Sequence, residues 1–390
     1  MGLTTIALDG DPQAQGFCVA DFSYVVDVRN KTEALKIAKK HNVHGVLTIA
    51  SDICVPTVAY VAKGMNLPGI DPKVAEVATN KFLMRRKFKE FHLPSPRFFQ
   101  TKSLTEVRQI ASILKYPFVI KPVDNAGSRG VSVVTKKEGL KCAFELAKKN
   151  SRIGELILEE FIEGIECTIE AMSYEGKTEI LAISDKKKPD GKYRVATDLV
   201  YPADFPKGII GEIKRVIKLA IKAIGIEMGP THSEVIVTPQ GRPVLVEVAA
   251  RGGGFKVFSD VVFLASGVDA EKETIKMSLG LPVDIKPKFE KGVVLHFFAP
   301  PPGILKEVIG LEDLKSIPQI EVGLFKKVGD RIPPLATDGS RTGYLISWGK
   351  SRKEALKKVQ TVENRIKFIV EAPDNLKSFM TNMCNEGLSI

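Results

Sequence analysis

A lysine followed by a loop of small residues is the first feature that can do chemistry. Residues 118–134 place Lys121 at the end of an apolar run, then a glycine-bearing loop, then a second apolar run. Backbone amides of the loop, which holds Ser128, Arg129 and Gly130, can approach phosphate oxygens because little side chain stands in the way. Lys121 would supply the positive charge. An ordinary hairpin also fits this pattern, so the loop alone does not fix a function.

Two glutamates on neighbouring strand-like runs form the second feature. Glu234 ends the sequence THSE, and Glu247 follows the turn-forming residues 239–242. The period of two in a strand puts His232 and Glu234 on one face, and a hairpin can bring Glu234 next to Glu247. Two carboxylates repel unless a cation lies between them, and Mg²⁺ prefers a few carboxylates plus phosphate oxygens. Pairing of each glutamate with lysine or arginine is the alternative.

An arginine followed by three glycines forms the third feature. Arg251 follows Glu247 by four residues and precedes Gly252, Gly253 and Gly254. A guanidinium can hold a carboxylate by two parallel hydrogen bonds, and glycines let a small anion come close to backbone amides. We therefore expect these four residues to cradle the carboxylate of a substrate. The alternative is that Arg251 only neutralises the nearby glutamates.

The elements that must position these residues begin with an alternation of strand-like and helix-like runs. Strand-like runs occupy residues 3–8, 24–28 and 45–50, and helix-like runs occupy residues 31–41 and 55–64. This alternation predicts a parallel sheet flanked by helices. The first run reads like the second strand of its domain, so we expect either a truncated chain or an unusually small domain.

The rest of the chain predicts a mixture of helices and strands around a hairpin. Helices are expected at residues 73–92, 137–149, 207–224 and 352–370, and strands at residues 117–121, 131–134, 155–161, 165–173, 231–238 and 243–248. The sequence LPSP after residue 92 forbids continuation of the helix before it, which indicates a domain junction.

Composition and charge narrow the class of protein. The chain has 390 residues, 44% hydrophobic and 26% charged, which is typical of a globular protein with two or three domains. We find no apolar run long enough to cross a membrane and no basic-then-apolar leader, so we expect a cytoplasmic protein that binds no membrane. Five cysteines without a CxxC pair predict reduced thiols. The net charge of +11 comes without an aromatic-rich basic motif, so we expect no nucleic-acid partner.

Taken together, the order and spacing of the motifs resemble the ATP-grasp superfamily from about residue 79 to residue 281, with an extension to about residue 370. The sequences THSE, EVAAR and TGYLISWGKSRKEAL look most similar to the bacterial dipeptide-forming L-amino acid ligases. The resemblance implies a mixed α/β and α+β ATP-grasp fold. We expect an N-terminal parallel α/β domain at residues 1–72 that lacks its first strand-helix unit, an ATP-grasp domain at residues 73–285 with a small lid at about 112–185, and a C-terminal α+β lobe at residues 286–390.

The resemblance also implies a role for each motif residue. ATP would be bound by Lys81, Lys121, Ser128, Arg129, Gly130, Glu159, Ile162, Glu166 and His232. Within that set the two lysines would contact the phosphates, Glu159 and Ile162 the adenine, and Glu166 the ribose. Glu234 and Glu247 would bind Mg²⁺, with Mn²⁺ as an alternative. The substrate would be bound by Lys186, Arg251, Gly252, Gly253 and Gly254, with Arg251 and Lys121 as the catalytic groups.

Two positions depart from the pattern of similar enzymes. Many of them carry asparagine two residues after the second metal-binding glutamate, where this chain has Ala249. The amino-acid ligases place a glutamate and a histidine before the proline at position 202, where this chain has Ala196 and Leu199. The first departure removes one expected metal contact. The second leaves open whether the substrate is an amino acid.

The sequence therefore predicts an ATP-dependent ligase that joins a small carboxylate to an amine through an acyl phosphate. One alternative is a formate- or bicarbonate-activating enzyme, similar to formate-dependent glycinamide ribonucleotide transformylase or the biotin carboxylases. Another is a nucleotide-binding subunit without turnover, although a mere binder would not need every phosphoryl-transfer group. The partners we expect are small molecules, and a homodimer is common among similar enzymes.

Overall fold

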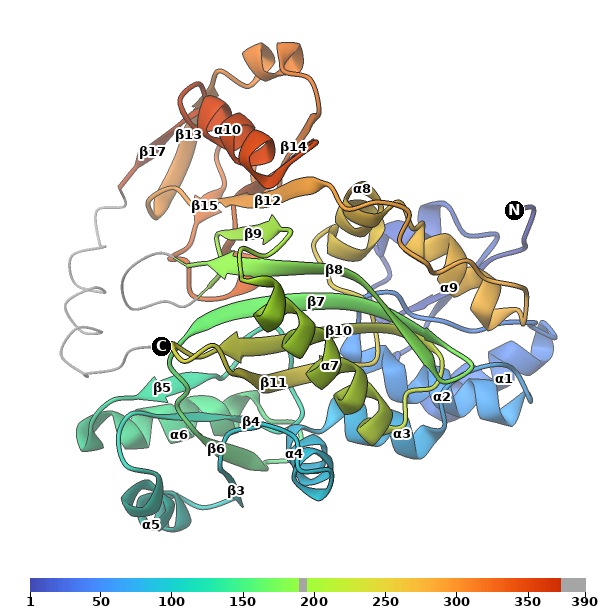
Figure 1. The fold of residues 1–390 in the computed structure, drawn as a ribbon. Coiled ribbons are helices and arrows are strands. Elements are labelled where there is room, and N and C mark those ends of the chain that lie inside the picture. The colour runs from blue at the N-terminus through green and yellow to red at the C-terminus, as the bar shows by residue number, and fades with distance from the viewer. Residues whose placement is uncertain (189–194, 373–390) are drawn as a thin grey trace.

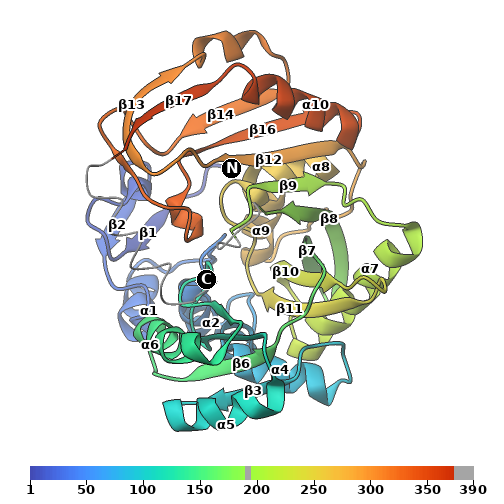
Figure 2. The same cartoon turned by 90° about the vertical axis from the view of Figure 1, so that its left-hand side faces the viewer.

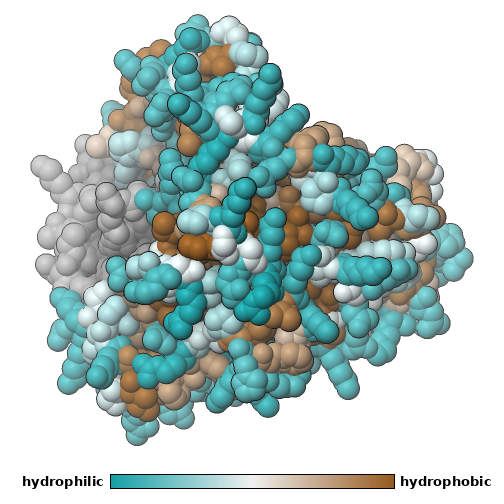
Figure 3. Space-filling view, in the orientation of Figure 1, coloured by the Kyte–Doolittle hydropathy of each residue, from teal (hydrophilic) through white to brown (hydrophobic). Residues whose placement is uncertain are grey.

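The structure is a computed structural model that describes residues 1–188 and 195–372. The N-terminal elements, the small unit with β3 and β6, the strands β10 and β11 with their neighbours, and the C-terminal lobe surround its centre (Figure 2). Hydrophilic residues cover most of the face shown in Figure 3, and apolar residues form smaller patches between them. Among the described residues, no helix is both long enough and apolar enough to cross a membrane.

The N-terminal part contains a parallel sheet of two strands, β1 (Ile6–Asp9) and β2 (Phe22–Val25). Helices α1 (Lys31–Lys40) and α2 (Val55–Gly64) pack beside it, close to their expected bounds. The strand expected at residues 45–50 does not form. The carbonyl of Ile49 instead accepts a hydrogen bond of 2.7 Å from the amide of Gly252, so this segment pairs with the loop of the candidate site and not with a strand.

The helix expected at residues 73–92 is divided into α3 (Pro72–Thr79) and α4 (Lys81–Glu90). Asn80 adopts an extended backbone at the break, and its side chain accepts hydrogen bonds from the amides of Phe82 and Leu83. An asparagine cap of this kind favours the start of a new helix. The break makes Lys81 the first residue of α4, where its side chain is buried and directed to the site.

A small unit with its own core precedes the large sheet. Its four antiparallel strands have the order β3-β6-β4-β5, with the bounds Phe98–Thr101, Leu156–Glu160, Phe118–Pro122 and Ser132–Val134. Helices α5 (Leu104–Leu114) and α6 (Leu140–Asn150) pack on it. This unit spans residues 98–160, whereas the expected lid spanned about 112–185; β7 and β8 belong to the large sheet.

The large sheet has eight strands in the order β11-β10-β7-β8-β9-β12-β16-β14 (Figure 1). Their bounds, in that order, are Pro243–Ala249, Gly229–Val237, Ile165–Tyr174, Lys177–Lys187, Asp198–Tyr201, Gly292–Phe298, Gly343–Gly349 and Ile320–Leu324. Strand β9 pairs with β12. The sheet therefore continues across the expected boundary between residues 285 and 286.

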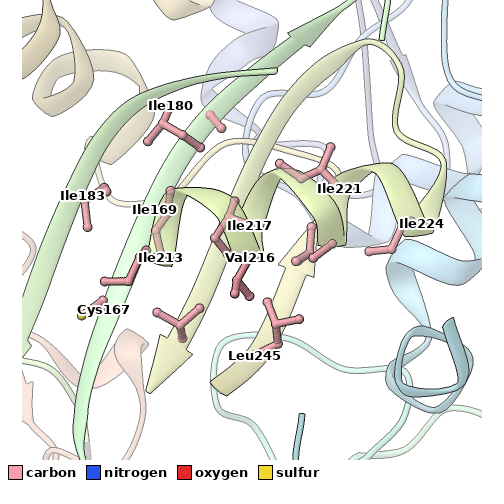
Figure 4. Close-up of a cluster of buried hydrophobic side chains, with 14 of the residues drawn as sticks. Cys167, Ile169, Ile180, Ile183, Ile213, Val216, Ile217, Ile221, Ile224 and Leu245 are labelled. Atoms are coloured by element: carbon pink, nitrogen blue, oxygen red, sulfur yellow. The ribbon is translucent and has the colours of Figure 1, made fainter. Parts of the chain in front are cut away.

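One long helix covers the half of this sheet that carries the candidate metal ligands. Helix α7 (Lys207–Ile224) ends at Gly225, whose left-handed backbone suits glycine. Its apolar residues recur at three- and four-residue spacing, which puts them on one face of the helix. That face packs on β7, β8, β10 and β11 through residues that include Ile213, Val216, Ile217, Ile221 and Ile224 (Figure 4).

The C-terminal lobe joins the large sheet to a second, three-stranded sheet of order β15-β13-β17, with bounds Arg331–Ile332, Gly303–Ile309 and Lys367–Glu371. Helix α10 (Arg352–Glu363) packs on β12 and β16. The helix expected at residues 352–370 therefore ends earlier. Residues 367–371 alternate between exposed and half-buried side chains, a strand pattern, and pair with β13.

Between β11 and the C-terminal lobe lie a π-helical turn, η4 (Val257–Val261), and two helices, α8 (Val262–Ser266) and α9 (Ala270–Ser278). Phe255 and Lys256, just before the turn, both have positive φ angles, of 51° and 65°. Such angles are uncommon for side chains of this size. They place a strained bend directly after the glycines of the candidate site.

Candidate active site

A cavity of about 710 Å³ lies where the small sheet, the large sheet, the N-terminal part and the C-terminal lobe meet. This volume suits a small ligand such as a nucleotide. The candidate site residues that line it are Lys81, Lys121, Ser128, Arg129, Glu159, Ile162, Glu166, Lys186, His232, Glu234, Glu247, Arg251 and Gly254. Gly130, Gly252 and Gly253 are not among the residues that line it. Positions far apart in the sequence thus converge on one hollow.

Glu234 and Glu247 are direct partners in the register of β10 and β11. Each carboxylate has a lysine beside it: Glu247 Oε1 lies 2.9 Å from Lys81 Nζ, and Glu234 forms an ion pair with Lys186. Lys186 also pairs with Glu166. The sequence allowed either two adjacent glutamates that share a cation or glutamates that are each paired with lysine or arginine. The structure combines features of both, because the two carboxylates are adjacent and each is paired with a lysine.

Charge pairing sets the ionisation of this group. Burial alone would raise the pKa of Glu234, but Lys186 and His232 outweigh it and hold the pKa well below its usual range. Burial likewise opposes the charge on Lys81, and Glu247 outweighs it, so the pKa of Lys81 is raised. Glu234 is therefore ionised and Lys81 is protonated near neutral pH.

The donor set suits a metal ion that arrives with its nucleotide. Within residues 1–188 and 195–372, no group of three or more histidine, cysteine, aspartate or glutamate side chains forms a closed metal site. Two adjacent carboxylates are a partial set of ligands, which fits Mg²⁺ because that ion takes its other ligands from phosphate oxygens and water. Ala249, beside His232 in the register, adds no oxygen from its side chain.

A buried ionic triad holds Lys121, the second lysine expected to contact phosphates. Lys121 Nζ lies 2.7 Å from Glu159 Oε2, and Arg85 Nε lies 2.8 Å from Glu159 Oε1. Arg85 also donates a hydrogen bond of 2.7 Å to the carbonyl of Val246, next to Glu247. Sequence reasoning missed Arg85, although its position four residues after Lys81 on a helix would have put both side chains on one face.

Burial lowers the pKa of Lys121, and the positive charges of Arg85 and Lys81 lower it further against the opposing effect of Glu159. Burial would raise the pKa of Glu159, but Arg85 and Lys121 outweigh it, so this pKa is lowered. The glutamate is therefore firmly ionised. Lys121 and Arg85 share the single negative charge of Glu159. The positive charge of Lys121 is therefore only partly neutralised, and a phosphate can neutralise the rest.

The glycine-bearing loop after β4 is fixed at its start. Lys81 Nζ donates a hydrogen bond of 2.7 Å to the carbonyl of Asn125, and Asp124 accepts one of 2.9 Å from the amide of Arg152. Ser128 has a positive φ of 59° and lines the cavity. Gly130 serves packing, since a Cβ there would lie 2.7 Å from the Cβ of Asn150. Only part of the loop thus faces the cavity.

Arg251 has a partner that the sequence did not indicate. Its Nε and Nη2 atoms lie 3.0 and 2.7 Å from Asp52 Oδ2, and Nη1 donates to the carbonyl of Gly252. Asp52 belongs to the 3₁₀ turn η2 (Asp52–Cys54) of the N-terminal part. The residue is 199 positions away along the chain. No local motif could therefore reveal it.

The three glycines after Arg251 were expected to help cradle a substrate carboxylate. For Gly252 and Gly253 this expectation is corrected, because both serve packing. A Cβ on Gly252 would lie 2.2 Å from Phe258 Cγ, and a Cβ on Gly253 would lie 2.7 Å from Glu170 Oε1. These two glycines permit close packing against the π-helical turn and a buried carboxylate. Gly254 lines the cavity and has no other atom within 4 Å of the place of a Cβ.

A buried glutamate that sequence reasoning missed joins two parts of the site. Glu170 has a completely buried side chain, contacts His232 Nδ1, and accepts a hydrogen bond of 3.0 Å from the amide of Gly253. Burial alone would lower the pKa of His232, but Glu170 outweighs it and raises the pKa to about 9. His232 is therefore charged near neutral pH and lies 3.8 Å from Glu234 Oε1. The alternation of β7 could have indicated an inward-facing Glu170.

Comparisons with known proteins agree with this geometry. Residues 114–259 match the family described as the ATP-grasp domain. Residues 296–371 match the family described as the L-amino acid ligase C-terminal domain 2. The first match contains β4 to β11 and therefore most of the residues that line the cavity. The second contains α10 and the strands that follow β12.

Several curated proteins are similar over much of the chain. The uncharacterized protein y4rH of Sinorhizobium fredii is 27% identical over 371 residues, which is 90% of this chain and 75% of that protein. The D-alanine–D-alanine ligase of Bordetella avium is 27% identical over 48% of this chain and 62% of its own length. The formate-dependent phosphoribosylglycinamide formyltransferase of Bacillus velezensis is 23% identical over 91% of this chain and 90% of its own length.

Solved structures show the same fold. The L-amino acid ligase from Bacillus licheniformis superposes with a TM-score of 0.81 at 22% identity, over 95% of this chain and 93% of that one. The phosphoribosylglycinamide synthetase from Anaerococcus prevotii superposes with a TM-score of 0.74 at 22% identity, over 95% of this chain and 94% of that one. The ATP-grasp fold expected from the motifs is confirmed.

Proposed function

We propose that this chain, an ATP-grasp protein that carries the C-terminal domain of the L-amino acid ligases, is an enzyme that joins a carboxylate to an amine at the expense of ATP. The observation that carries the proposal is one cavity in which Glu234 and Glu247 are adjacent and Lys81, Lys121 and Arg251 surround them. Phosphoryl transfer needs such a set, because positioned cations must neutralise charge on the transferred group.

Each residue then has a role. Lys81 and Lys121 hold the phosphates of ATP, Glu166 holds the ribose, and Glu159 and Ile162 lie at the adenine. Glu234 and Glu247 hold Mg²⁺, or Mn²⁺, which when bound neutralises phosphate charge. Ser128 and Arg129 belong to the loop that covers the phosphates. These assignments rest on the family pattern and on the position of every one of these residues in the wall of the cavity.

The reaction has two steps. A substrate carboxylate oxygen attacks the γ-phosphorus in line, which forms an acyl phosphate and releases ADP. The neutral amine then attacks the acyl carbon, phosphate leaves, and the amine nitrogen loses a proton as the amide forms. Arg251, fixed by Asp52, orients the carboxylate beside Gly254. The covering loop excludes water that would hydrolyse the acyl phosphate.

The alternatives differ in the acid that is activated. A formate- or bicarbonate-activating enzyme would use the same nucleotide site, and one similar relative carries the name of a formate-dependent transferase. The substrate part of this cavity is lined by Phe255, Phe297, Leu199 and Ala196, which offer more apolar surface than either small anion needs. This lining favours a larger carboxylate, which includes an amino acid. A homodimer and a cytoplasmic location stay predictions.

ADP release across a matrix of small carboxylates and amines tests the proposal. We expect ADP and phosphate only when ATP, Mg²⁺, a carboxylate and an amine are all present. Bicarbonate and formate form separate arms of the matrix. ADP formation in those arms alone would assign the alternative enzyme class. Binding of ATP without ADP release in any arm would assign a nucleotide-binding subunit instead.

A further inference from the structure

An arginine of the C-terminal lobe also lines the cavity and has no role in the chemistry assigned so far. Arg341 directly precedes β16 in the C-terminal lobe and is only 6% exposed, yet it forms part of the cavity wall. Its guanidinium carbon lies 3.6 Å from the ring centre of Phe297 and 4.9 Å from that of Phe255. Aromatic faces hold a guanidinium in place and leave its edges free for hydrogen bonds.

The hydrogen bonds of Arg341 use only one nitrogen. Nη2 donates 2.9 Å to the carbonyl of Ala196 and lies 2.9 Å from Asp338 Oδ1. Nε is buried and has no hydrogen-bond partner among the described residues. Within residues 1–188 and 195–372, Nη1 donates no hydrogen bond. Burial lowers the pKa of Arg341, and Asp338 only partly opposes that effect. Buried cations normally have all their donors satisfied, so this one lacks an acceptor.

The surroundings of Arg341 are otherwise apolar. Ala196, Leu199 and Val257 line the same cavity, and all three are largely buried. In the part of the chain that the structure describes, the neighbours of Arg341 in this region are mainly apolar side chains. Asp338 is the only acidic residue there that contacts the guanidinium. Such a region suits an anionic group on an apolar body.

We propose that Arg341 is a second anion-binding group of the active site, and that one of the two substrates carries an acid group besides the carboxylate that ATP activates. The inference rests on the proposed ligase function and narrows its substrates. Arg251 does not fill this role, because the proposed function already assigns it to the carboxylate that ATP activates. The extra acid group belongs either to a dicarboxylic acid or to an amine that is itself an amino acid.

Two sets of substrate pairs separate these sources. The first set compares butanoate with butanedioate, pentanoate with pentanedioate and hexanoate with hexanedioate, with hydroxylamine as the amine. The second set compares alanine with ethylamine and leucine with 3-methylbutylamine, using the best acid of the first set. The expected result in one set is a preference of at least about tenfold in kcat/KM for the compound with the extra carboxylate, since losing a charged hydrogen bond costs that much.

The variant Arg341→Met tests the residue. We expect the preference to fall to within about twofold, because kcat/KM for the compound with the extra carboxylate should fall far more than kcat/KM for its partner that lacks the acid group. Arg341→Lys should keep part of the preference, because a point charge remains without the fork of the guanidinium. Arg331→Met, which removes an exposed charge from the same lobe, is the matched control and should change nothing.

The outcomes are distinguishable from a failure of the ligase proposal. ADP release without any preference for the extra acid group in the wild type would overturn the role of Arg341 and leave the ligase function standing. A preference that persists in Arg341→Met would overturn it as well. If Arg341→Met does not fold, the substrate preference of the wild type and of Arg341→Lys still tests the role of Arg341. No ADP with any pair, or with any acid and amine of the wider matrix, would overturn both proposals.

Discussion

At the scale of residues, the site is a set of ion pairs that exist before a nucleotide binds. Lys81 pairs with Glu247, Lys121 with Glu159, and Lys186 with Glu166 and Glu234. Buried charges of this kind are costly unless they are paired. ATP and Mg²⁺ therefore do not enter an uncharged pocket. Under the proposed function they would exchange partners with charged side chains that are already paired.

The first prediction concerns the metal-holding pair. Glu247→Gln keeps the size of the side chain but removes a negative charge, so under the proposed function the cation would lose one ligand, and Lys81 loses its charged partner. We expect kcat to fall at least about 100-fold, with the fold retained. ADP release and circular dichroism measure the two effects. Glu163→Gln, at an exposed position beyond β6, is the control. A near-normal rate at ordinary Mg²⁺ would make Glu247 a structural residue.

The second prediction uses the lowered pKa of Lys121. Burial and the charges of Arg85 and Lys81 make the ammonium of Lys121 lose its proton at a lower pH than an ordinary lysine does. The protonated form binds phosphate, so KM for ATP should rise as the pH increases through that lowered pKa. Lys121→Arg keeps its charge to a higher pH and should displace the rise upward. KM for ATP between about pH 7 and pH 10 is the measurement.

The exposed substitution Lys137→Arg serves as the control for this pH series and should follow the wild type. If the wild type and Lys121→Arg show the same dependence, another group causes it and Lys121 does not contact the phosphates.

The third prediction separates the two interpretations of Arg251. Asp52→Asn removes the charge that fixes the guanidinium, so a cradle would lose its orientation. We expect KM for the carboxylate to rise about tenfold while KM for ATP changes little, since a charged hydrogen bond is worth about that much. Asp27→Asn, in an exposed aspartate–arginine pair, is the matched control. Lower stability with unchanged KM values would show that Arg251 and Asp52 serve only to join two parts of the fold.

At the scale of elements, local patterns predicted most helices and hairpin strands of the fold, and long-range contacts decided the exceptions. Helices α2 and α7 begin and end where the sequence indicated. The break at Asn80 was missed because a capping asparagine inside a long amphipathic run was not recognised as a helix start. Within residues 45–50, Ile49 packs near Phe258 and accepts a hydrogen bond from Gly252, whereas Val46 packs with α1 and α2, and a strand-like pattern cannot distinguish such packing from sheet pairing.

The fourth prediction concerns the glycines after β11. Gly252→Ala would place a Cβ 2.2 Å from the ring of Phe258, which is itself buried, so η4 must shift. Overpacking of this kind costs about 1–3 kcal/mol of unfolding free energy. Gly254→Ala is a close control, because no other atom lies within 4 Å of the new methyl group and its φ is not positive. Urea unfolding of the two variants should differ; equal stability would refute the packing role of Gly252.

At the scale of the whole molecule, the motifs predicted which residues gather and the fold explains how they are held. Lys81, Lys121, Glu234, Glu247 and Arg251 all line one cavity, as their spacing within short motifs indicated. Their supporting partners could not be predicted. Asp52, Arg85, Glu170 and Arg341 each reach the site from another element, and no spacing rule connects residues that the folded chain alone brings together.

The fifth prediction follows from the large sheet, which continues across the boundary expected at residue 285. Strand β9 pairs with β12 on one side and with β8 on the other. A chain ending at residue 285 would lose β12, β16 and β14 and expose the edge of β9, where Val200 and Tyr201 are almost completely buried. An exposed apolar strand edge favours aggregation. We therefore expect residues 1–285 to lack a cooperative unfolding transition.

The control is a chain of residues 1–372, which retains every described element and should unfold in one cooperative transition on heating. Size-exclusion chromatography and near-ultraviolet circular dichroism compare the two chains. A monomeric, cooperatively folded product of residues 1–285 that binds ATP would show that the ATP-grasp domain is independent of the C-terminal lobe. In that case Arg341 would act across a domain interface and not within one continuous sheet, and removing the lobe would leave nucleotide binding intact while abolishing selection of the substrate.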